Sequence, residues 1–574
     1  MNKGYRLFLI LVALAASMVL GLQSRAQDSD RKAELLSQVG EVKLIDPFDV
    51  HSWPLTLGAE RPESGSASNT SQTSGPAREN PKPATTPGSN TSQTSISKRA
   101  DESDKLEGSA STVFSYNFEG ASTGELVYIL RRFGNWRCDF SFHPLGISLW
   151  VKGAKDNPGE LRLTLLQAND LSVVKPQVSQ MFTCTDTSGA IRCDGWTRVI
   201  FPFSDFEPMV APTNAPADAE LRPLDLSSVI GYRIELVNST AVSGAGEFRL
   251  DKMEQLTSFR PQWNKNAKFS SLFIQIGPTY ADADWDKIFS AGKRVGITTW
   301  FLQYCVGHKK FEHCAYYKNC SLPWITERYD IVDKMFEAAE RLSCKIVVGP
   351  YFQYWGDTDI TQRTRYAEML TNNKLVIDEL AANFGSSPAF AGWYIADEFH
   401  DGSARVNANW YPQAATEQLA WYLEENASYM KSKVNAPVCI APALWKGHPA
   451  RMTGEWFGRL FSLTPSIDEL YLQDCCGRGP DTVMSVGVDL ANYYTEIKKA
   501  CDANGVAFGV DIESFFRCSM LKMPRRQKTW KELAPQLWMA GAFTDKITNF
   551  SWATFKPGYY TYEGYKKYFD QLGE

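Results

Sequence analysis

Two stretches decide the fold of the C-terminal half, Phe390-Ala-Gly-Trp-Tyr-Ile-Ala-Asp-Glu398 and Phe508-Gly-Val-Asp-Ile-Glu513. Each is a short apolar run that ends in acidic residues, as a buried strand with polar residues at its carboxyl end does. Amphipathic segments with helical spacing flank both stretches. The pattern predicts strands that alternate with helices, and therefore a parallel sheet.

The alternation recurs eight times between residues 270 and 574. Eight such units in about 300 residues fit one closed (β/α)8 barrel, which we predict as the catalytic domain. An open doubly wound sheet is the alternative, but it needs a glycine-rich turn that Ile276-Gly-Pro-Thr279 does not provide. The expected strands are Leu272–Gly277, Thr298–Val306, Lys345–Phe352, Phe390–Glu398, Val438–Leu444, Glu469–Asp474, Phe508–Glu513 and Ile547–Thr554, and the clearest expected helices are Glu327–Leu342, Gln362–Phe384, Ala415–Lys433, Asp489–Ala503 and Thr529–Phe543.

Residues 41–258 are predicted to form an all-β jelly roll or β-sandwich, because short strands follow one another without a long helix. Within this module, residues 61–110 are rich in Ser, Thr and Pro and are expected to be a disordered insert. The expected strands are Val113–Phe118, Ile147–Val151, Leu161–Gln167, Thr197–Pro202, Gly231–Leu236 and Gly246–Leu250.

The first 26 residues indicate export. Lys3 and Arg6 precede the apolar run Leu7–Leu22, and Ser24-Arg-Ala26 offers a cleavage site, as in a secretory signal peptide. An uncleaved anchor helix is the alternative. No later run is long and apolar enough to cross a membrane, so we expect a secreted, periplasmic or cell-surface protein without a membrane span after cleavage.

The composition disfavours nucleic acid as a partner and suggests disulfide bonds. A formal net charge of −5 over 574 residues disfavours nucleic-acid binding, which usually requires a basic excess. Twelve cysteines in an exported chain predict disulfides. Cys184 with Cys193, and Cys314 with Cys320, are spaced to close short loops. The other pairings and the oligomeric state stay open.

The candidate catalytic residues are Glu398 and Glu513, which end the fourth and seventh barrel strands. Active sites of this fold lie at the carboxyl ends of the strands, and these two strands face each other across the mouth. Glycoside hydrolysis needs one protonated and one ionised carboxyl group on either side of a bond. The alternative for either residue alone is a rim ion pair. The sequence therefore predicts a glycosidase that acts on a poly- or oligosaccharide.

Other strand ends supply candidate substrate contacts. Carboxylates and amides bind sugar hydroxyls, and aromatic rings pack on the apolar faces of sugars. Each of these residues has core packing as its alternative role. The candidates are Asp397, Gln473, Asp474, Trp552, Trp355 and Tyr304.

The N-terminal module resembles jelly-roll carbohydrate-binding modules. The resemblance rests on Ile147-Ser-Leu-Trp-Val-Lys-Gly153, on Trp196 to Phe206, on Leu224-Asp-Leu226 and on Gly246 to Asp251. Such modules often open with a strand similar to Leu44–Trp53, which would place the Ser/Thr-rich tract inside the module. The module then either binds glycan or only braces the barrel.

The two glutamates resemble the acid/base and the nucleophile of a large clan of retaining glycosidases, with Glu398 in the first role and Glu513 in the second. In that clan the acid/base usually follows an asparagine, whereas Asp397 stands there in this chain. An ionised Asp397 accepts hydrogen bonds but does not donate them, and its charge would raise the pKa of Glu398.

A closer resemblance covers nearly the whole barrel. Phe273-Ile-Gln275, Gly392 to Glu398, Leu472-Gln-Asp474 with Gly477, and Asp511 to Phe515 are similar to bacterial domain-of-unknown-function family 4434. The resemblance implies a TIM barrel with hydrolase activity and adds Gln275 to the candidate substrate contacts. The family tends to carry glycine and an aliphatic residue where Cys475-Cys476 stand here, either as a vicinal disulfide or with other partners.

No cofactor or catalytic metal is expected. His308 and His313 lie near Cys305, Cys314 and Cys320, where a metal site is conceivable but disulfides are favoured in an exported chain. Asp49 and Asp251 would meet in a jelly roll and suggest a structural Ca²⁺. The alternatives to a hydrolase are a non-catalytic glycan-binding protein, and a barrel lyase or isomerase for acidic sugars that would use Arg478 and Arg517.

Overall fold

The computed structural model of the chain forms two compact units. Unit 1 comprises Met1–Phe133, His143–Asn169 and Val178–Phe259, and unit 2 comprises Gly134–Phe142, Asp170–Gln177 and Arg260–Glu574. The structure describes residues 30–46, 48, 55–60, 94–106, 110–133, 139–157, 159–171, 176–209, 222–239, 244–307, 313–351, 363–400, 411–444, 448–477, 486–516 and 526–573.

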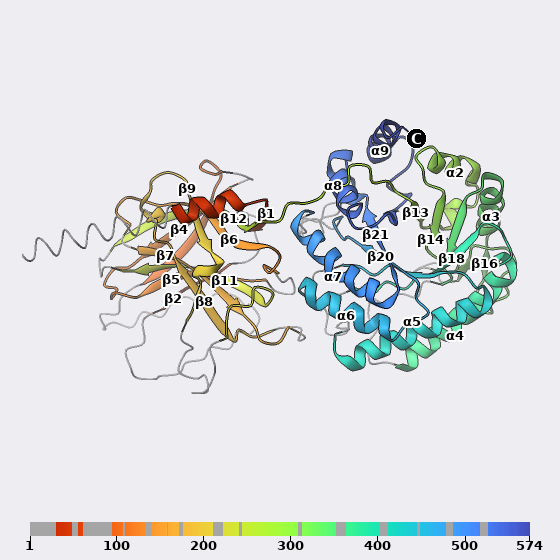
Figure 1. The fold of residues 1–574 in the computed structure, drawn as a ribbon, viewed down its shortest axis with the longest axis horizontal. Coiled ribbons are helices and arrows are strands. Elements are labelled where there is room, and N and C mark those ends of the chain that lie inside the picture. Colours follow the sequence, from red (N-terminus) through yellow and green to blue (C-terminus); the bar gives the residue numbers. More distant parts are fainter. Residues whose placement is uncertain are drawn as a thin grey trace, which may run out of the picture. The chain divides into compact units, whose positions relative to one another are not determined.

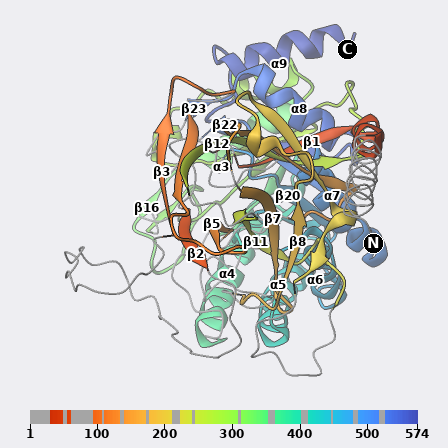
Figure 2. The same cartoon turned by 90° about the vertical axis from the view of Figure 1, so that its left-hand side faces the viewer.

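Unit 1 is a β-sandwich of two six-stranded antiparallel sheets, as its described residues show. One sheet has the order β3-β4-β12-β6-β9, with β1 also paired to β12, and the other has the order β10-β8-β7-β11-β5-β2. Figure 2 shows β7, β8 and β11 of the second sheet side by side. The strands are β1 (Glu41–Asp46), β2 (Thr56–Glu60), β3 (Ser95–Asp101), β4 (Ser111–Asn117), β5 (Leu126–Arg132), β6 (Pro144–Lys152), β7 (Gly159–Gln167), β8 (Gln180–Thr185), β9 (Thr197–Pro202), β10 (Glu207–Pro208), β11 (Val229–Asn238) and β12 (Ala245–Thr257).

A buried aspartate joins the two sheets of the sandwich. Asp46 at the end of β1 accepts hydrogen bonds from Arg131 Nε of β5, at 2.9 Å, and from Tyr232 Oη of β11, at 2.6 Å. Its other oxygen accepts from the Phe48 amide at 2.9 Å. A buried charge is tolerated only when it is paired and hydrogen-bonded, which this arrangement achieves across the core.

The Ser/Thr-rich tract interrupts the sandwich between β2 and β3. Strands β1 and β2 precede it and belong to opposite sheets, so the tract is an insertion within the module rather than a linker before it. The expected disorder up to residue 110 was too extensive, because β3 pairs with β4 in register from Ser95↔Asn117 to Asp101↔Ser111. Residues 61–93 lie outside the described part of the chain.

Unit 2 contains the expected closed barrel of parallel strands, in the order β13-β14-β17-β18-β19-β20-β21-β24. Helices surround the strands in Figure 1. The barrel strands are β13 (Ser271–Ile274), β14 (Thr299–Leu302), β17 (Lys345–Val348), β18 (Phe390–Ile395), β19 (Val438–Ile440), β20 (Glu469–Gln473), β21 (Ala507–Glu513) and β24 (Ile547–Phe550). The helices are α2 (Trp285–Lys293), α3 (Ile331–Leu342), α4 (Arg363–Phe384), α5 (Gln413–Lys433), α6 (Ala450–Ser462), α7 (Val488–Asn504), α8 (Trp530–Ala540) and α9 (Tyr560–Gln571). Short pairs outside the barrel are β15 (Cys314–Ala315) with β16 (Glu327–Arg328), and β22 (Phe515–Phe516) with β23 (Arg526–Gln527).

Aromatic side chains fill the middle of the barrel. The Phe273 ring lies 4.8 Å from that of Phe301 and 5.3 Å from that of Tyr394, and Tyr471 lies 4.8 Å from Phe301. These four residues come from β13, β14, β18 and β20, so they form one layer across the interior. The layer closes the barrel below the carboxyl ends of the strands.

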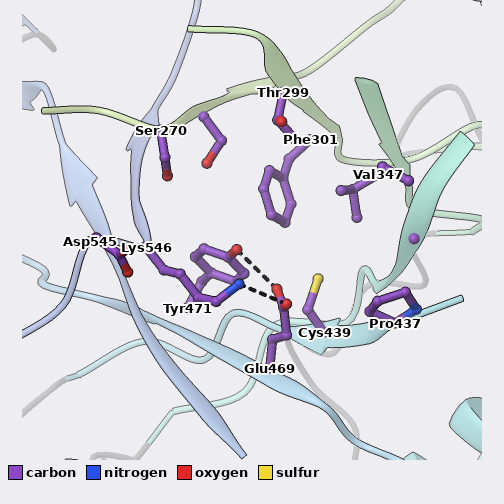
Figure 3. Close-up of a pocket in the computed structure, with 13 residues that line it drawn as sticks. Ser270, Thr299, Phe301, Val347, Pro437, Cys439, Glu469, Tyr471, Asp545 and Lys546 are labelled. Atoms are coloured by element: carbon purple, nitrogen blue, oxygen red, sulfur yellow. Dashed lines mark hydrogen bonds and ion pairs between the residues drawn. The ribbon is translucent and has the colours of Figure 1, made fainter. Parts of the chain in front are cut away.

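A cavity of about 330 Å³ lies on the other side of this layer, at the amino ends of the strands. Its lining includes the Glu469 carboxylate, which pairs with Lys546 at 2.9 Å and accepts from Tyr471 Oη at 3.0 Å (Figure 3). Side chains at this end of a TIM barrel contribute to stability, whereas active sites form at the opposite end. The catalytic site is therefore expected at the carboxyl ends of the barrel strands.

The short-range disulfide predictions were wrong. Cys193, Cys314 and Cys320 are free thiols in the structure, so neither the Cys184–Cys193 nor the Cys314–Cys320 bond is formed. Close spacing in sequence does not by itself form a disulfide, because the local backbone sets the direction of each thiol. The Cys314 thiol, for example, points to the Glu327 carboxylate, with Sγ 3.6 Å from Oε2.

The predicted signal peptide, residues 1–26, lies outside the described part of the chain. Among the helices that the structure describes, none is both long and apolar enough to cross a membrane.

Candidate active site

The carboxyl ends of β18 and β21 position Glu398 and Glu513. Glu398 follows β18 in a segment that stays aligned with β19, since Ala443 N donates to Phe399 O at 2.8 Å. Tyr394 faces the interior, and a two-residue alternation from it brings Glu398 to the same face. Glu513 is the last residue of β21, in register with Phe550 of β24.

A buried glutamine orients Glu398. Gln303 follows β14 and is only 2% exposed, and its Nε2 donates to Glu398 Oε1 at 3.3 Å. Its backbone amide donates to Ile274 O at 3.1 Å, so the glutamine is itself anchored to β13. Glu398 is half-buried. One carboxylate oxygen is therefore held from inside the barrel.

Glu513 is held by three main-chain contacts. Gly477 N donates to Glu513 Oε2 at 2.6 Å, Lys528 Nζ donates to Glu513 O at 2.9 Å, and Glu513 N donates to Asp474 Oδ1 at 3.3 Å. A Cβ on Gly477 would lie 2.5 Å from Glu513 Oε2, so only glycine permits this approach. The side chain, 5% exposed, is fixed in direction.

The loop after β20 turns sharply to make this contact. Cys475 has a φ of 50°, in the left-handed region that favours glycine, and the residue is fully buried. Cys476 N donates to Asp474 Oδ1 at 3.1 Å, which closes the turn. The Cys475-Cys476 pair thus stands in the turn that brings Gly477 to Glu513.

Asp474 completes a buried ring behind Glu513. It is fully buried and accepts from Gln536 Nε2 of α8, and Gln536 Oε1 accepts from Lys528 Nζ at 2.6 Å. Burial raises the pKa of Asp474, although the charge of Lys528 and the hydrogen bond from Gln536 oppose the shift. The predicted contact of Asp474 with sugar hydroxyls stays a prediction, and its position behind Glu513 favours a supporting role.

Asp511 is a further buried acidic side chain, in β21. It lies on β21 two residues before Glu513, is fully buried, and neither carboxylate oxygen has a hydrogen-bond partner among the described residues. Its pKa lies well above its usual range, first because of burial and then because of the charges of Asp474, Glu513 and Glu398. Asp511 is in register with Gln473 of β20, so it lies on the strand beside the one that Asp474 follows.

Asp397 points away from this region. Its Oδ2 accepts from Tyr422 Oη of α5 at 2.6 Å, and the residue is 2% exposed. Asp397 and Glu398 are consecutive, so their side chains leave the backbone on opposite faces. Asp397 therefore lies in the layer between β18 and the helices, where it anchors the segment that carries Glu398.

Trp552, one of the aromatic candidates, is buried against another aromatic side chain. Trp552 is 7% exposed, packs edge-on against Trp300 at 5.6 Å, and lines a hollow beside α2 with Ala291 and Pro557. The ring that faces the interior from this strand is Phe550, which lies 5.8 Å from Phe273. Trp552 is thus a packing residue against α2 in this structure.

The remaining candidates differ in their environment. Gln473 is 7% exposed and donates to Ala441 O at 2.7 Å, which ties β20 to β19. Tyr304 is 5% exposed and packs 6.3 Å from Tyr316, and burial raises its pKa. Gln275 is half-buried just beyond β13. Trp355 lies outside the described residues.

Several residues that shape the site were not among the sequence-based candidates. Gln303, Asp511, Lys528 and Gln536 are buried polar side chains within or beside apolar runs. Asp511 carried a usable signal, because it lies two residues before Glu513 and so shares its face of the strand. Lys528 and Gln536 carried none, since they precede or lie on α8 and meet Glu513 only through the fold.

The suggested calcium site is only half within the described residues. Asp251 accepts from the Leu106 amide at 2.8 Å, and Asp49 lies outside the described part.

Residues 274–559 match the family described as "Domain of unknown function (DUF4434)". The barrel region belongs to this family. The match begins at the last residue of β13 and extends beyond β24, so the DUF4434 domain includes every strand end discussed above. No curated protein matches the sequence.

Three of the solved structures that match the chain carry names of carbohydrate-active proteins, and all three are of low identity. A "putative alpha-L-fucosidase" from Bacteroides thetaiotaomicron is 21% identical, and the match covers 54% of this chain and 97% of that one with a TM-score of 0.42. Xylanase10C from Cellvibrio japonicus is 10% identical over 83% of this chain and 97% of its own, with a TM-score of 0.35. The family 11 carbohydrate-binding module from Clostridium thermocellum is 13% identical over 38% and 95%, with a TM-score of 0.25.

Proposed function

We propose that the DUF4434 barrel hydrolyses glycosidic bonds in a poly- or oligosaccharide, with Glu398 as acid/base and Glu513 as nucleophile. The observation that carries the proposal is the position of the two glutamates at the carboxyl ends of strands four and seven of one closed barrel. Residues just beyond two other barrel strands hold them, since Gln303 donates to Glu398 and the Gly477 amide donates to Glu513. Paired carboxyl groups in that position suit glycoside hydrolysis.

The proposed reaction has two steps. Glu398 donates its proton to the glycosidic oxygen as the bond to the anomeric carbon breaks, and Glu513 forms a covalent ester with that carbon. Glu398 then takes a proton from water, which attacks the anomeric carbon and breaks its bond to Glu513, so that Glu513 is released as a carboxylate. This retaining course requires the two carboxyl groups to stand about 5–5.5 Å apart.

The surrounding groups support these roles in different ways. The Gly477 amide donates to one oxygen of Glu513 and thereby fixes the orientation of the carboxylate, as a nucleophile requires. Gln303 donates to one oxygen of Glu398 and so helps to orient the carboxyl group that exchanges a proton with the substrate. Asp474 and Asp397 act as positioning residues, through the Glu513 amide and Tyr422 respectively.

The first experiment is a screen of purified protein for reducing sugar released from plant, algal, host and bacterial glycans. Glu398→Gln is expected to lower kcat by about 10²–10⁴-fold, the usual contribution of acid/base catalysis. Glu513→Gln is expected to abolish turnover. The matched control is Glu469→Gln, because this carboxylate lies in the same barrel at the amino ends of the strands.

Azide separates the two roles. With Glu398→Ala, azide should attack the ester intermediate and yield a glycosyl azide that keeps the substrate's configuration. With Glu513→Ala, azide should replace the carboxylate and yield the opposite configuration, read by proton NMR. Cleavage that survives both substitutions contradicts the proposal, and an unsaturated product would indicate a lyase. Binding without cleavage would indicate a non-catalytic glycan-binding protein.

We also propose that the chain is exported and that residues 1–26 are removed, as the charged and apolar pattern of this segment suggests. N-terminal sequencing of protein recovered outside the cytoplasm should begin at Gln27. An intact N-terminus in a membrane fraction would instead indicate the anchor.

A further inference from the structure

The segment between β14 and α3 gathers three different metal-binding side chains outside the proposed catalytic site. Strand β15 pairs in parallel with β16, in the register Cys314↔Glu327 and Ala315↔Arg328. The carbonyl of His313 accepts from Thr326 N at 3.0 Å and from Glu327 N at 3.2 Å. The backbone pairing therefore fixes His313 and Cys314 beside Glu327.

The donor atoms are spaced as ligands of one ion. His313 Nε2 lies 3.4 Å from Glu327 Oε1, and Cys314 Sγ lies 3.6 Å from Glu327 Oε2. All three groups have a ligand atom within 4.8 Å of the others. Zinc bonds of about 2.0–2.2 Å to nitrogen or oxygen and about 2.3 Å to sulfur, at tetrahedral angles, give edges of roughly 3.3–3.7 Å.

We propose that His313, Cys314 and Glu327 bind one divalent transition-metal ion of the zinc type, with water as the fourth ligand. Imidazole, thiolate and carboxylate together form a donor set suited to zinc and to cobalt, and unsuited to calcium or magnesium, which take oxygen ligands. Binding replaces the proton of the Cys314 thiol, which leaves to solvent. The Cys314 thiol takes part in no disulfide.

Neighbouring groups fit this assignment. Tyr329 Oη donates to Glu327 Oε2 at 2.8 Å, which orients the carboxylate so that Oε1 faces His313, as an outer-shell partner of a metal ligand does. Arg328 points elsewhere, since its Nε donates to Cys320 O at 2.6 Å. Cys314 is fully buried, while His313 and Glu327 are partly exposed, which leaves a side for entry of the ion.

A bound ion would restrain the segment that contains β15 and β16, which follows the carboxyl end of β14. Tyr316 packs 6.1 Å from Tyr329 and 6.3 Å from Tyr304, and its amide donates to Cys305 O at 2.9 Å. An ion between β15 and β16 would therefore restrain Tyr316, which packs on Tyr304. The inference is independent of the proposed hydrolysis.

Cobalt tests the site directly. Purified protein without a histidine tag is treated with a chelator and titrated with Co²⁺. We expect one equivalent to bind, with a thiolate-to-cobalt charge-transfer band in the near ultraviolet and visible d–d bands of tetrahedral intensity. Zn²⁺ should remove these bands by displacement and raise Tm. Absence of a thiolate band, or weak d–d bands typical of octahedral cobalt, would overturn the proposal.

Variants assign the ligands. Cys314→Ser should abolish the charge-transfer band, and His313→Ala, at a partly exposed position, should weaken binding without unfolding the protein. Tyr329→Phe should raise the Kd by about 10–100-fold, the usual effect of removing an outer-shell partner. The matched control is Cys320→Ser, a buried thiol of the same segment, which should leave the spectrum unchanged. A band that persists in Cys314→Ser would also overturn the proposal.

Discussion

Asp46 in the sandwich and Asp511 in the barrel are both fully buried, yet their surroundings differ completely. Asp46 accepts hydrogen bonds from Arg131, Tyr232 and the Phe48 amide. Asp511 has no hydrogen-bond partner among the described residues, and its neighbours are other acids that raise its pKa.

The difference is the one expected between a structural carboxylate and a carboxylate in the catalytic site that we propose. A buried charge that holds two sheets together is neutralised by partners, because the fold depends on it. A buried acid without such partners costs stability, and strongly perturbed acids of this kind cluster at catalytic sites. The comparison therefore agrees with the catalytic site proposed at the carboxyl ends of the barrel strands.

The largest expected effect is on the sandwich. Asp46→Ala leaves the buried Arg131 guanidinium without its counter-charge, and we expect a loss of about 3–5 kcal/mol in the free energy of unfolding of unit 1. Urea denaturation measures the loss. Asp205→Ala removes an exposed ion pair with Arg31 and should cost less than about 1 kcal/mol. Equal losses in the two variants would contradict the assignment of Asp46.

Next in size is the support of Glu513. Gly477→Ala places a methyl group against Glu513 Oε2 and the Phe515 carbonyl, which should cost about 1–3 kcal/mol of stability. Displacement of the carboxylate should lower kcat by about 10²-fold. Gly458→Ala in α6, where only Ala500 Cβ comes within 4 Å, is the control and should be close to neutral. An unchanged kcat in Gly477→Ala would mean that Glu513 needs no such support.

The protonation of Asp511 should make the free energy of unfolding depend on pH. Its folded pKa lies above its unfolded value of about 3.9, so the native state holds the extra proton. Its contribution to stability is full below that value and is lost as pH rises through the folded pKa, with a slope approaching about 1.4 kcal/mol per pH unit.

Asp511→Asn removes this titration. The free energy of unfolding of unit 2, measured from pH 4 upward in urea, should then fall less steeply with pH than in the wild type. Parallel curves for the two proteins would show that Asp511 is ionised in the folded state.

The smallest effect is expected at Gln303. Gln303→Ala removes the hydrogen bond to Glu398, and kcat/KM should fall by up to about tenfold, since a hydrogen bond to a neutral group contributes about 0.5–1.5 kcal/mol. The pH profile of kcat should shift as well, which a purely structural role would not cause. A fall in stability without a shift would place Gln303 outside the site.

The fold was largely predictable because it depends on periodicity. Each expected barrel strand overlaps an observed one, as Phe508–Glu513 does with β21 (Ala507–Glu513). The prediction of the sandwich strands was less complete. It missed β5 (Leu126–Arg132), and β3 (Ser95–Asp101) lay in the segment expected to be disordered. Both contain charged residues that find partners only in the fold, such as Arg131 with Asp46 and Arg99 with Glu247.

The site was less predictable because neighbouring residues in an extended segment face opposite ways. The sequence placed Asp397 and Glu398 together, but Asp397 turns to Tyr422 while Glu398 faces the interior. Alternation does not separate Trp552 from Phe550, because they are two residues apart. Trp552 lies beyond the end of β24 and packs on Trp300, whereas Phe550 packs on Phe273. Contacts such as Lys528 with the Glu513 carbonyl depend on where α8 docks, which no local pattern encodes.

The hold on Glu513 has an evolutionary consequence. Its direction is set by the amide of Gly477 and by buried groups, namely Asp474, Gln536 and Lys528. None of these is a residue of the exposed rim. If Glu513 is the nucleophile that we propose, rim residues can be exchanged without disturbing its orientation, so substrate specificity and reactivity can evolve separately.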